Sequence, residues 1–276
     1  MEQFKPTGFK ILPPVVKNIL IINGLFFLAT IALQSAYKID LTNILGMHYF
    51  GSSLFKPYQI VTYMFMHGGF AHIFFNMFAV WMFGNVLENY WGPKRFFIYY
   101  MVTGIGAILI QMLVSYLSIH PIQQAIELYI SNPSPEFFDK IITGHFEGYF
   151  NPQVMTSFLS DFYSHPTNAS LVKQSSDILN ELLTFRMDVP TIGASGAVFG
   201  VLLAFGMMFP NSVIYIYFAI PMKAKWFVVL YGAIELYSGI ANSQSDNIAH
   251  FAHLGGMLFG FFLIMYWNKK IKNSYF

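Results

Sequence analysis

Apolar stretches about as long as a membrane is thick recur along the 276-residue chain, separated by polar segments of unequal length. A helix needs about 20 residues to cross the ~30 Å hydrocarbon core of a bilayer. The pattern predicts six such helices: Val16–Ala36, Phe70–Asn89, Phe96–Ser118, Ile192–Phe209, Ala224–Ala241 and Asn247–Trp267. The fourth and fifth are short, at about 18 residues, and would span only with little tilt or in a locally thinned bilayer. The fold class predicted is therefore an all-α polytopic membrane protein.

The connections between these stretches differ in character. Gly92-Pro93, within NYWGPKRF, stops one helix and restarts the next. Residues 120–188 are polar and acidic, with helical patches such as SSDILNELLTF and turns at SNPSPEFF and SHPTNAS. We interpret residues 120–188 as an extramembrane insertion within a single membrane domain, residues 1–276, rather than as a separate domain.

Composition agrees with a membrane protein, because 55% of residues are hydrophobic, 10% are charged and the mean hydropathy is +0.52. The absence of cysteine excludes disulfides, thiolate metal sites and cysteine catalysis. No internal repeat is visible, which gives little support to a transporter built from duplicated halves.

Lysines and arginines predict the orientation. Ten of the bases fall in short segments on one side: Lys5, Lys10, Lys17, Lys94, Arg95, Lys223, Lys225, Lys269, Lys270 and Lys272. The bases of the other side are spread over a much longer stretch of chain. Both termini are therefore expected in the cytoplasm, with the insertion outside, and the second, fourth and sixth helices start at the outer face.

Four polar side chains then fall at a similar shallow depth under the outer surface: Ser195, His253, His72 and Asn76. Polar or ionisable groups inside a membrane are costly and are functional candidates by default. His72 and Asn76 are four residues apart and so share one helix face. Lysines and arginines alone predict the orientation, so the common depth of these four residues is an independent agreement.

Each of these residues also has a purely structural interpretation. A serine within GASG is more often a packing residue than a nucleophile, and a lone histidine in a membrane helix is often structural. Two glycine pairs suit close helix packing: Gly196 with Gly200, and Gly256 with Gly260. If these ridges pack together, however, they bring Ser195 and His253 near each other, and this joint occurrence favours chemistry.

The residue types define what that chemistry would be. Serine is a weak nucleophile until a base takes its proton, and imidazole is the usual partner. The Ser195 amide lies at a predicted helix N-terminus, which favours negative charge, and His72 and Asn76 could donate further hydrogen bonds to an oxyanion.

Acidic partners for such a pair are scarce in the sequence. Apart from Asp246, no Asp or Glu lies at the outer ends of these helices, so a Ser–His dyad is expected rather than a triad. Glu235, within the fifth helix, and Glu88, at the inner end of the second, are interpreted as structural hydrogen-bonding residues.

These motifs resemble the rhomboid intramembrane serine proteases. The matching pieces occur in the family's order: HGGFAHIFFN with His72 and Asn76, GASGAVFG with Ser195, and AHFAHLGGMLFG with His253. They are accompanied by GNVLENYWGPKRF and FPNS. The resemblance covers roughly residues 16–119 and 189–268.

The resemblance implies a six-helix rhomboid-like bundle in which Ser195 attacks the scissile carbonyl and His253 acts as general base, then acid. His72, Asn76 and the Ser195 amide would bind the oxyanion, without a metal or cofactor. The expected substrates are single-pass transmembrane proteins, cut near the outer face of a lipid bilayer. The expected location is a bacterial inner membrane, and no nucleic acid partner is expected.

Two further histidines need an assignment. The family pattern A-H-x-x-G points to His253 rather than His250, because His250 has no glycine three residues after it. His67 is expected to be a loop residue outside the reacting groups.

The chain departs from the family in two places. Tyr58-Gln59 stands where Trp-Arg is common, and the insertion 120–188 is much longer than the usual loop. The insertion could be a cap, a substrate-selecting surface or a partner site. Two other functions fit part of the pattern: an inactive relative that binds membrane clients, and a metal or proton transporter that uses the histidines. The first is disfavoured by the retained serine and histidine, and the second by the scarcity of acidic partners and of repeats.

Overall fold

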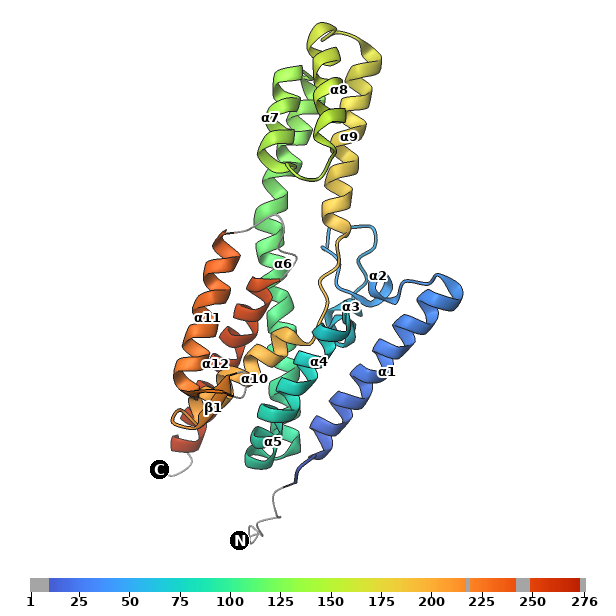
Figure 1. The fold of residues 1–276 in the computed structure, drawn as a ribbon. Helices are drawn as coiled ribbons and strands as arrows, with labels where there is room; N and C mark the ends of the chain where they lie inside the picture. The colour runs from blue at the N-terminus through green and yellow to red at the C-terminus, as the bar shows by residue number, and fades with distance from the viewer. Residues whose placement is uncertain (1–9, 217–218, 242–248, 274–276) are drawn as a thin grey trace. The chain divides into compact units, whose positions relative to one another are not determined.

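The computed structural model describes residues 10–216, 219–241 and 249–273, and helices dominate it (Figure 1). The helices are α1 (Pro14–Tyr37), α2 (Leu41–Leu45), α3 (Gln59–Thr62), η1 (Tyr63–Phe65), α4 (Phe70–Ala79), η2 (Val80–Gly84), α5 (Asn85–Trp91), α6 (Pro93–Ser131), α7 (Pro135–His145), α8 (Pro152–Ser164), α9 (Ala169–Asp188), α10 (Ser195–Met208), α11 (Ala224–Ala241) and α12 (His250–Asn273). The strands β1 (Val213–Ile216) and β2 (Ile220–Lys223) pair as an antiparallel hairpin. The mainly helical fold predicted from the sequence is confirmed.

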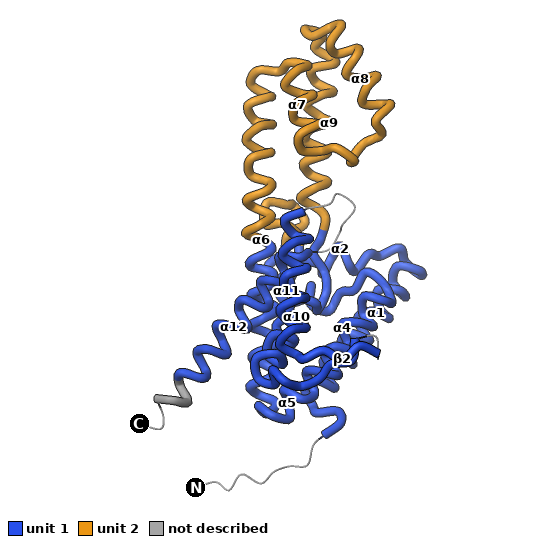
Figure 2. Tube along the Cα trace, turned by 60° about the vertical axis from the view of Figure 1, so that its left-hand side comes forward, with its two compact units in different colours: residues 1–47, 56–111, 190–276 blue, residues 48–55, 112–189 orange. Residues whose placement is uncertain are grey.

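The chain divides into two compact units (Figure 2). Unit 1 comprises residues 1–47, 56–111 and 190–276, and unit 2 comprises residues 48–55 and 112–189. Every candidate site residue of the sequence belongs to unit 1.

Four helical stretches within the described residues are long and apolar enough to cross a membrane. They are α1, the run Phe70–Trp91 formed by α4, η2 and α5, then α6, and His250–Lys269 of α12. α10, with 14 residues, and α11, with 18, fall outside this group. These are the two helices expected to be short, so the count of six membrane spans stays a prediction. The start of the sixth predicted helix at Asn247 lies outside the described residues.

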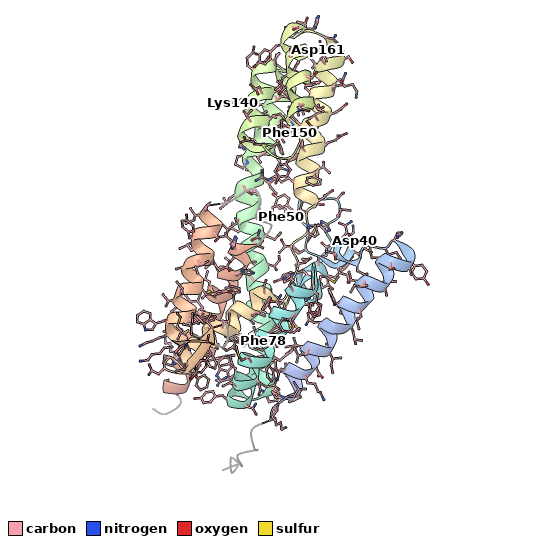
Figure 3. All side chains as sticks on the ribbon, viewed as in Figure 1. Asp40, Phe50, Phe78, Lys140, Phe150 and Asp161 are labelled. Atoms are coloured by element: carbon pink, nitrogen blue, oxygen red, sulfur yellow. The ribbon has the colours of Figure 1, made fainter. Side chains whose placement is uncertain are left out.

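α1 presents an apolar surface typical of lipid contact. Its side chains stand out from the helix (Figure 3), and those of Ile21, Leu25 and Leu28 are all more than half exposed. Glu88 of α5 fixes the N-terminus of α1, because its two carboxylate oxygens accept hydrogen bonds from the amides of Val15 and Val16 at 2.9 and 2.8 Å. Glu88 thus has the hydrogen-bonding role expected of it.

α6 continues well beyond the end expected at Ser118. It runs to Ser131 with Pro121 inside it. Its residues up to Gln111 belong to unit 1, and its later residues contribute to the core of unit 2. Ile119, Ile122, Ile126 and Tyr129 recur at helical spacing and are all buried there. This stripe explains why the polar sequence after Ser118 stays helical.

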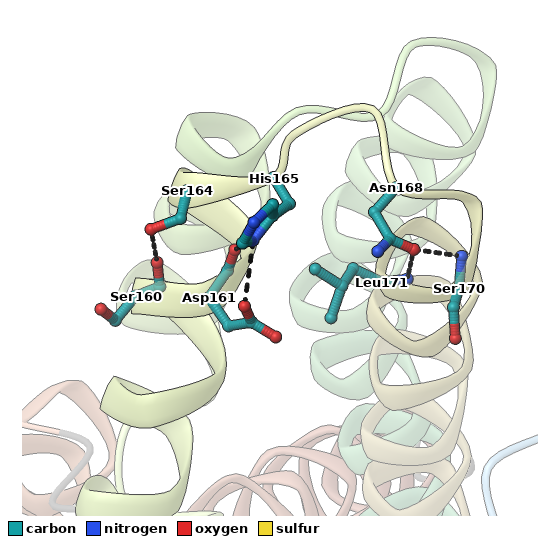
Figure 4. Close-up of polar contacts among 7 residues, drawn as sticks. All are labelled: Ser160, Asp161, Ser164, His165, Asn168, Ser170 and Leu171. Atoms are coloured by element: carbon teal, nitrogen blue, oxygen red, sulfur yellow. Dashed lines mark hydrogen bonds and ion pairs between the residues drawn. The ribbon is translucent and has the colours of Figure 1, made fainter.

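Unit 2 has its own aromatic core and well-defined helix caps. Phe138 of α7, Phe162 of α8 and Leu179 of α9 are completely buried together with the α6 stripe. The turn SHPTNAS separates α8 from α9, where the Asn168 side chain accepts hydrogen bonds from the amides of Ser170 and Leu171 at 2.9 and 3.4 Å (Figure 4).

α10 is the buried helix of unit 1, and glycines set its distance from its neighbours. A Cβ on Gly256 of α12 would lie 1.9 Å from the carbonyl oxygen of Gly196, so α10 and α12 touch backbone to backbone at this point. Gly200 and Gly260 face α6 instead, where an added Cβ would meet Thr103 at 2.6 Å and the Tyr99 hydroxyl at 2.2 Å, respectively. The two glycine ridges therefore meet each other at Gly196 and Gly256, and both ridges also pack closely against α6.

Candidate active site

The segment that leads into α10 is held by backbone hydrogen bonds. Thr191 and Met47 form a two-way antiparallel bridge with N···O distances of 2.9 and 2.8 Å. The Gly193 amide donates to the carbonyl of Tyr63 at 2.9 Å, and Gly193 has a φ of +119°, which side chains rarely tolerate. Ser195 follows as the first residue of α10, so its amide has no acceptor within the helix.

Ser195 and His253 meet at hydrogen-bond distance. The Oγ of Ser195 lies 2.8 Å from Nε2 of His253, which stands in the first turn of α12. This contact follows from the close approach of α10 and α12 at Gly196 and Gly256. A hydroxyl that donates to an unprotonated imidazole nitrogen has the geometry needed for proton transfer.

Phe199 fixes the plane of the His253 ring. The two rings stack with centroids 4.2 Å apart and planes only 6° apart. Phe199 follows Ser195 by four residues on α10, so one helix face supplies both the hydroxyl and the stacking ring. Tyr231 of α11 packs against the Phe199 ring in turn, at 5.5 Å between centroids.

A carboxylate stands at the other nitrogen of His253. Oε2 of Glu235, on α11, lies 2.8 Å from Nδ1 of His253 and 2.6 Å from Nδ1 of His250. Glu235 and His253 are each only 8% exposed. The expectation that no acidic group accompanies Ser195 and His253 is therefore wrong. It failed because α11 packs against α12, which brings a residue from inside one helix to the first turn of the other.

Asp246, the acidic residue singled out from the sequence, lies outside the described residues.

His72, on the first turn of α4, points its Nε2 toward the same space. Its Nδ1 accepts a hydrogen bond from the Gly68 amide at 3.4 Å, so the neutral ring carries its proton on Nε2. A Cβ on Gly193 would lie 2.8 Å from that Nε2 and 3.6 Å from Oγ of Ser195. The His72 N–H and the Ser195 hydroxyl therefore flank one glycine.

Asn76 and His67 both contact His72. The Asn76 side-chain amide donates to the backbone carbonyl of His72 at 3.0 Å, which leaves its second N–H uncommitted in this contact. His67 is buried and packs edge-on against the His72 ring, with centroids 4.9 Å apart. Among the residues that the structure describes, neither Asn76 nor His67 forms a hydrogen bond to Ser195.

Residues 54–121 and 149–270 match the family of the Rhomboid domain. The chain belongs to the rhomboid family. Rhomboids are intramembrane proteases, so the match places the chain in a family of hydrolases and, with the apolar helices, makes it an integral multi-pass membrane protein. A comparison with curated proteins finds no match.

Two features of this rhomboid site were not predicted from the sequence. One is Phe199, although its spacing of four from Ser195 places it on the same helix face. The other is the contact of Glu235 with His253, because spacing along a chain does not give the register between α11 and α12. A glutamate inside an apolar helix was itself the available signal, since charges at membrane depth are rarely without a partner.

Glu235, His250 and His253 also form a set of potential metal ligands. One ligand atom from each of Glu235, His250 and His253 lies within 4.8 Å of the others. A cation bound at Nδ1 of His253 would leave the ring's proton on Nε2, where it would oppose a hydrogen bond from Ser195. The absence of a metal from the reaction stays a prediction.

Proposed function

We propose that this rhomboid is an intramembrane serine endopeptidase, with Ser195 as nucleophile and His253 as general base. The observation that supports the proposal is the 2.8 Å contact between Oγ of Ser195 and Nε2 of His253, in a partly buried site of a chain without cysteine. Activation of a serine by a hydrogen-bonded imidazole is a common solution for acyl transfer.

The proposed reaction proceeds in two halves. Oγ of Ser195 bonds to the scissile carbonyl carbon while its proton passes to Nε2 of His253, and the carbonyl electron pair moves to oxygen. The C–N bond then breaks, and His253 returns the proton to the departing amine. A water molecule repeats the sequence on the acyl-enzyme, which releases the carboxyl product and restores Ser195.

The developing oxyanion needs donors, each worth about 2.7–4 kcal/mol in well-built sites. We assign this role to the Ser195 amide, to Nε2–H of His72 and to the uncommitted N–H of Asn76. The amide lies at the N-terminus of α10, where the helix dipole favours negative charge. The His72 proton is directed there because the Gly68 amide occupies Nδ1.

We propose single-pass transmembrane proteins as substrates, cleaved near the outer face of the membrane. Backbone groups inside a helix are hydrogen-bonded, so a substrate helix must unwind locally before its carbonyl becomes accessible, which favours helix-destabilising sequences. The distribution of lysine and arginine supports both termini in the cytoplasm and residues 120–188 outside, and the proposed location is a bacterial inner membrane.

The test is cleavage of a model transmembrane substrate by the purified protein and by Ser195→Ala. The variant should leave the substrate intact, while equal cleavage by both proteins would refute the proposal. A fluorophosphonate should label the wild type, and His253→Ala should remove that labelling. Labelling that survives in His253→Ala would refute His253 as the base.

A further inference from the structure

The carboxylate of Glu235 belongs to the same hydrogen-bonded chain as the proposed nucleophile and base. Three side chains follow one another at hydrogen-bond distance: Ser195 through Oγ, His253 through Nε2 and Nδ1, and Glu235 through Oε2. We propose that Glu235 is a positioning residue for His253, so that the site operates as a Ser–His–Glu array. This inference rests on the proposed protease function.

The arrangement of protons favours this role. Oε2 of Glu235 faces two imidazole nitrogens, Nδ1 of His253 and Nδ1 of His250. A proton on Oε2 could serve only one of them, whereas an ionised carboxylate accepts from both. With its proton on Nδ1, His253 presents an unprotonated Nε2 to Ser195, which is the tautomer that can take the serine proton.

The negative charge of the Glu235 carboxylate also favours the positioning role. When His253 takes the proton of Ser195 it becomes a buried cation, which is costly without a partner. The ionised carboxylate of Glu235, 2.8 Å from Nδ1, offsets that cost while the imidazolium exists. Phe199 stacks on one face of the His253 ring and so restricts rotation of the ring out of its plane.

The second histidine holds Glu235 in place. His250 stands less than one helical turn before His253 on α12, and its Nδ1 lies 2.6 Å from Oε2 of Glu235. Within the described part of the chain, the titratable groups that face His253 are Glu235 from α11, His250 from its own helix and His72 from α4. Of these three, only Glu235 contributes a negative charge.

Rescue by the conservative variant separates positioning from a merely structural role. In Glu235→Gln the labelling rate should fall by about 10²-fold, at the low end of what general-base catalysis contributes. Glu235→Asp keeps the negative charge next to Nδ1 and should recover part of that rate.

Glu88→Gln is the matched control. Glu88 is also a buried glutamate that accepts two N–H hydrogen bonds, but its donors are the amides at the start of α1. Its loss should lower thermal stability while the folded fraction labels at the wild-type rate. A Glu235→Gln protein that labels at the wild-type rate, or a Glu88→Gln protein whose folded fraction loses as much labelling, would overturn the proposal.

A measurement on the unaltered protein covers the case in which Glu235→Gln fails to fold. Nitrogen-15 resonances of labelled His253 in the full-length wild type should report a protonated Nδ1 and a bare Nε2, and a proton on Nε2 would overturn the proposal. Failure of the protease function itself is recognised separately, because Ser195→Ala would then label or cleave like the wild type.

Discussion

Gly193 lies between His72 and Ser195, and its lack of a side chain allows these two residues to approach each other. A Cβ at this position would lie 2.8 Å from Nε2 of His72, and φ is +119°. Gly193→Ala should therefore displace the proposed oxyanion donor and reduce fluorophosphonate labelling by about 10²–10³-fold, as expected for one lost donor. Labelling rates of the folded protein are the measurement.

Gly69→Ala is the control for that substitution. Gly69 also lies next to the site, just before α4, but it has extended backbone and nothing within 4 Å of an added Cβ. It should label like the wild type. Equal losses in both variants would mean that the segment, and not the Gly193 contact, is sensitive to change.

The Glu235–His250–His253 cluster makes a separate prediction about metal ions. Zn²⁺ accepts two imidazoles and a carboxylate as ligands, and at Nδ1 of His253 it would force the proton onto Nε2. Added Zn²⁺ should slow labelling, and a chelator should restore it. His250→Ala should be less sensitive to Zn²⁺ than the wild type, whereas unchanged sensitivity would place the inhibitory ion elsewhere.

At the scale of helices, the contact between α10 and α12 carries the Ser195–His253 pair. A Cβ on Gly256 would lie 1.9 Å from the carbonyl oxygen of Gly196, and backbone cannot yield as a flexible side chain does. Gly256→Ala should cost about 3 kcal/mol of stability, at the upper end for overpacked cores. It should also abolish labelling, because it separates the two helices that hold the reacting atoms.

The appropriate reference is Gly24→Ala on α1, where an added Cβ meets nothing within 4 Å. Thermal unfolding and labelling of the two variants in the same detergent are the measurements. A Gly256→Ala protein that retains wild-type labelling would show that the pair does not depend on this contact.

Helices were easier to predict from the sequence than the contacts between them. Apolar length located α1 and the bounds of α11 well, and the polar residues Ser195 and His253 identified the helices that meet. Spacing of four residues placed Gly200 and Gly260 on the glycine ridges of their helices, but it could not tell that both would face α6, because spacing defines a helix face and not the crossing of two helices. The same limit hid the partner of Glu235.

At the scale of the whole molecule, the family match and the compact units divide the chain differently. The Rhomboid match omits residues 122–148, which hold α7 and part of α6, whereas unit 2 extends over residues 112–189. The sequence indicated that residues 120–188 are unusual for the family and contain helical segments. It could not predict that these helices share one core, because the core depends on which buried faces of α6, α7, α8 and α9 meet.

Unit 1 contains every atom of the proposed chemistry, which predicts the effect of removing residues 120–188. Ser195, His253 and Glu235, with the hydrogen bonds among them, all lie within unit 1. Replacing residues 120–188 by a short flexible linker should therefore change the relative cleavage rates of two transmembrane substrates more than the rate of fluorophosphonate labelling. A folded deletion variant that fails to label would mean that unit 2 helps to build the site, whereas one that cleaves both substrates in the wild-type ratio would exclude a role for unit 2 in substrate choice.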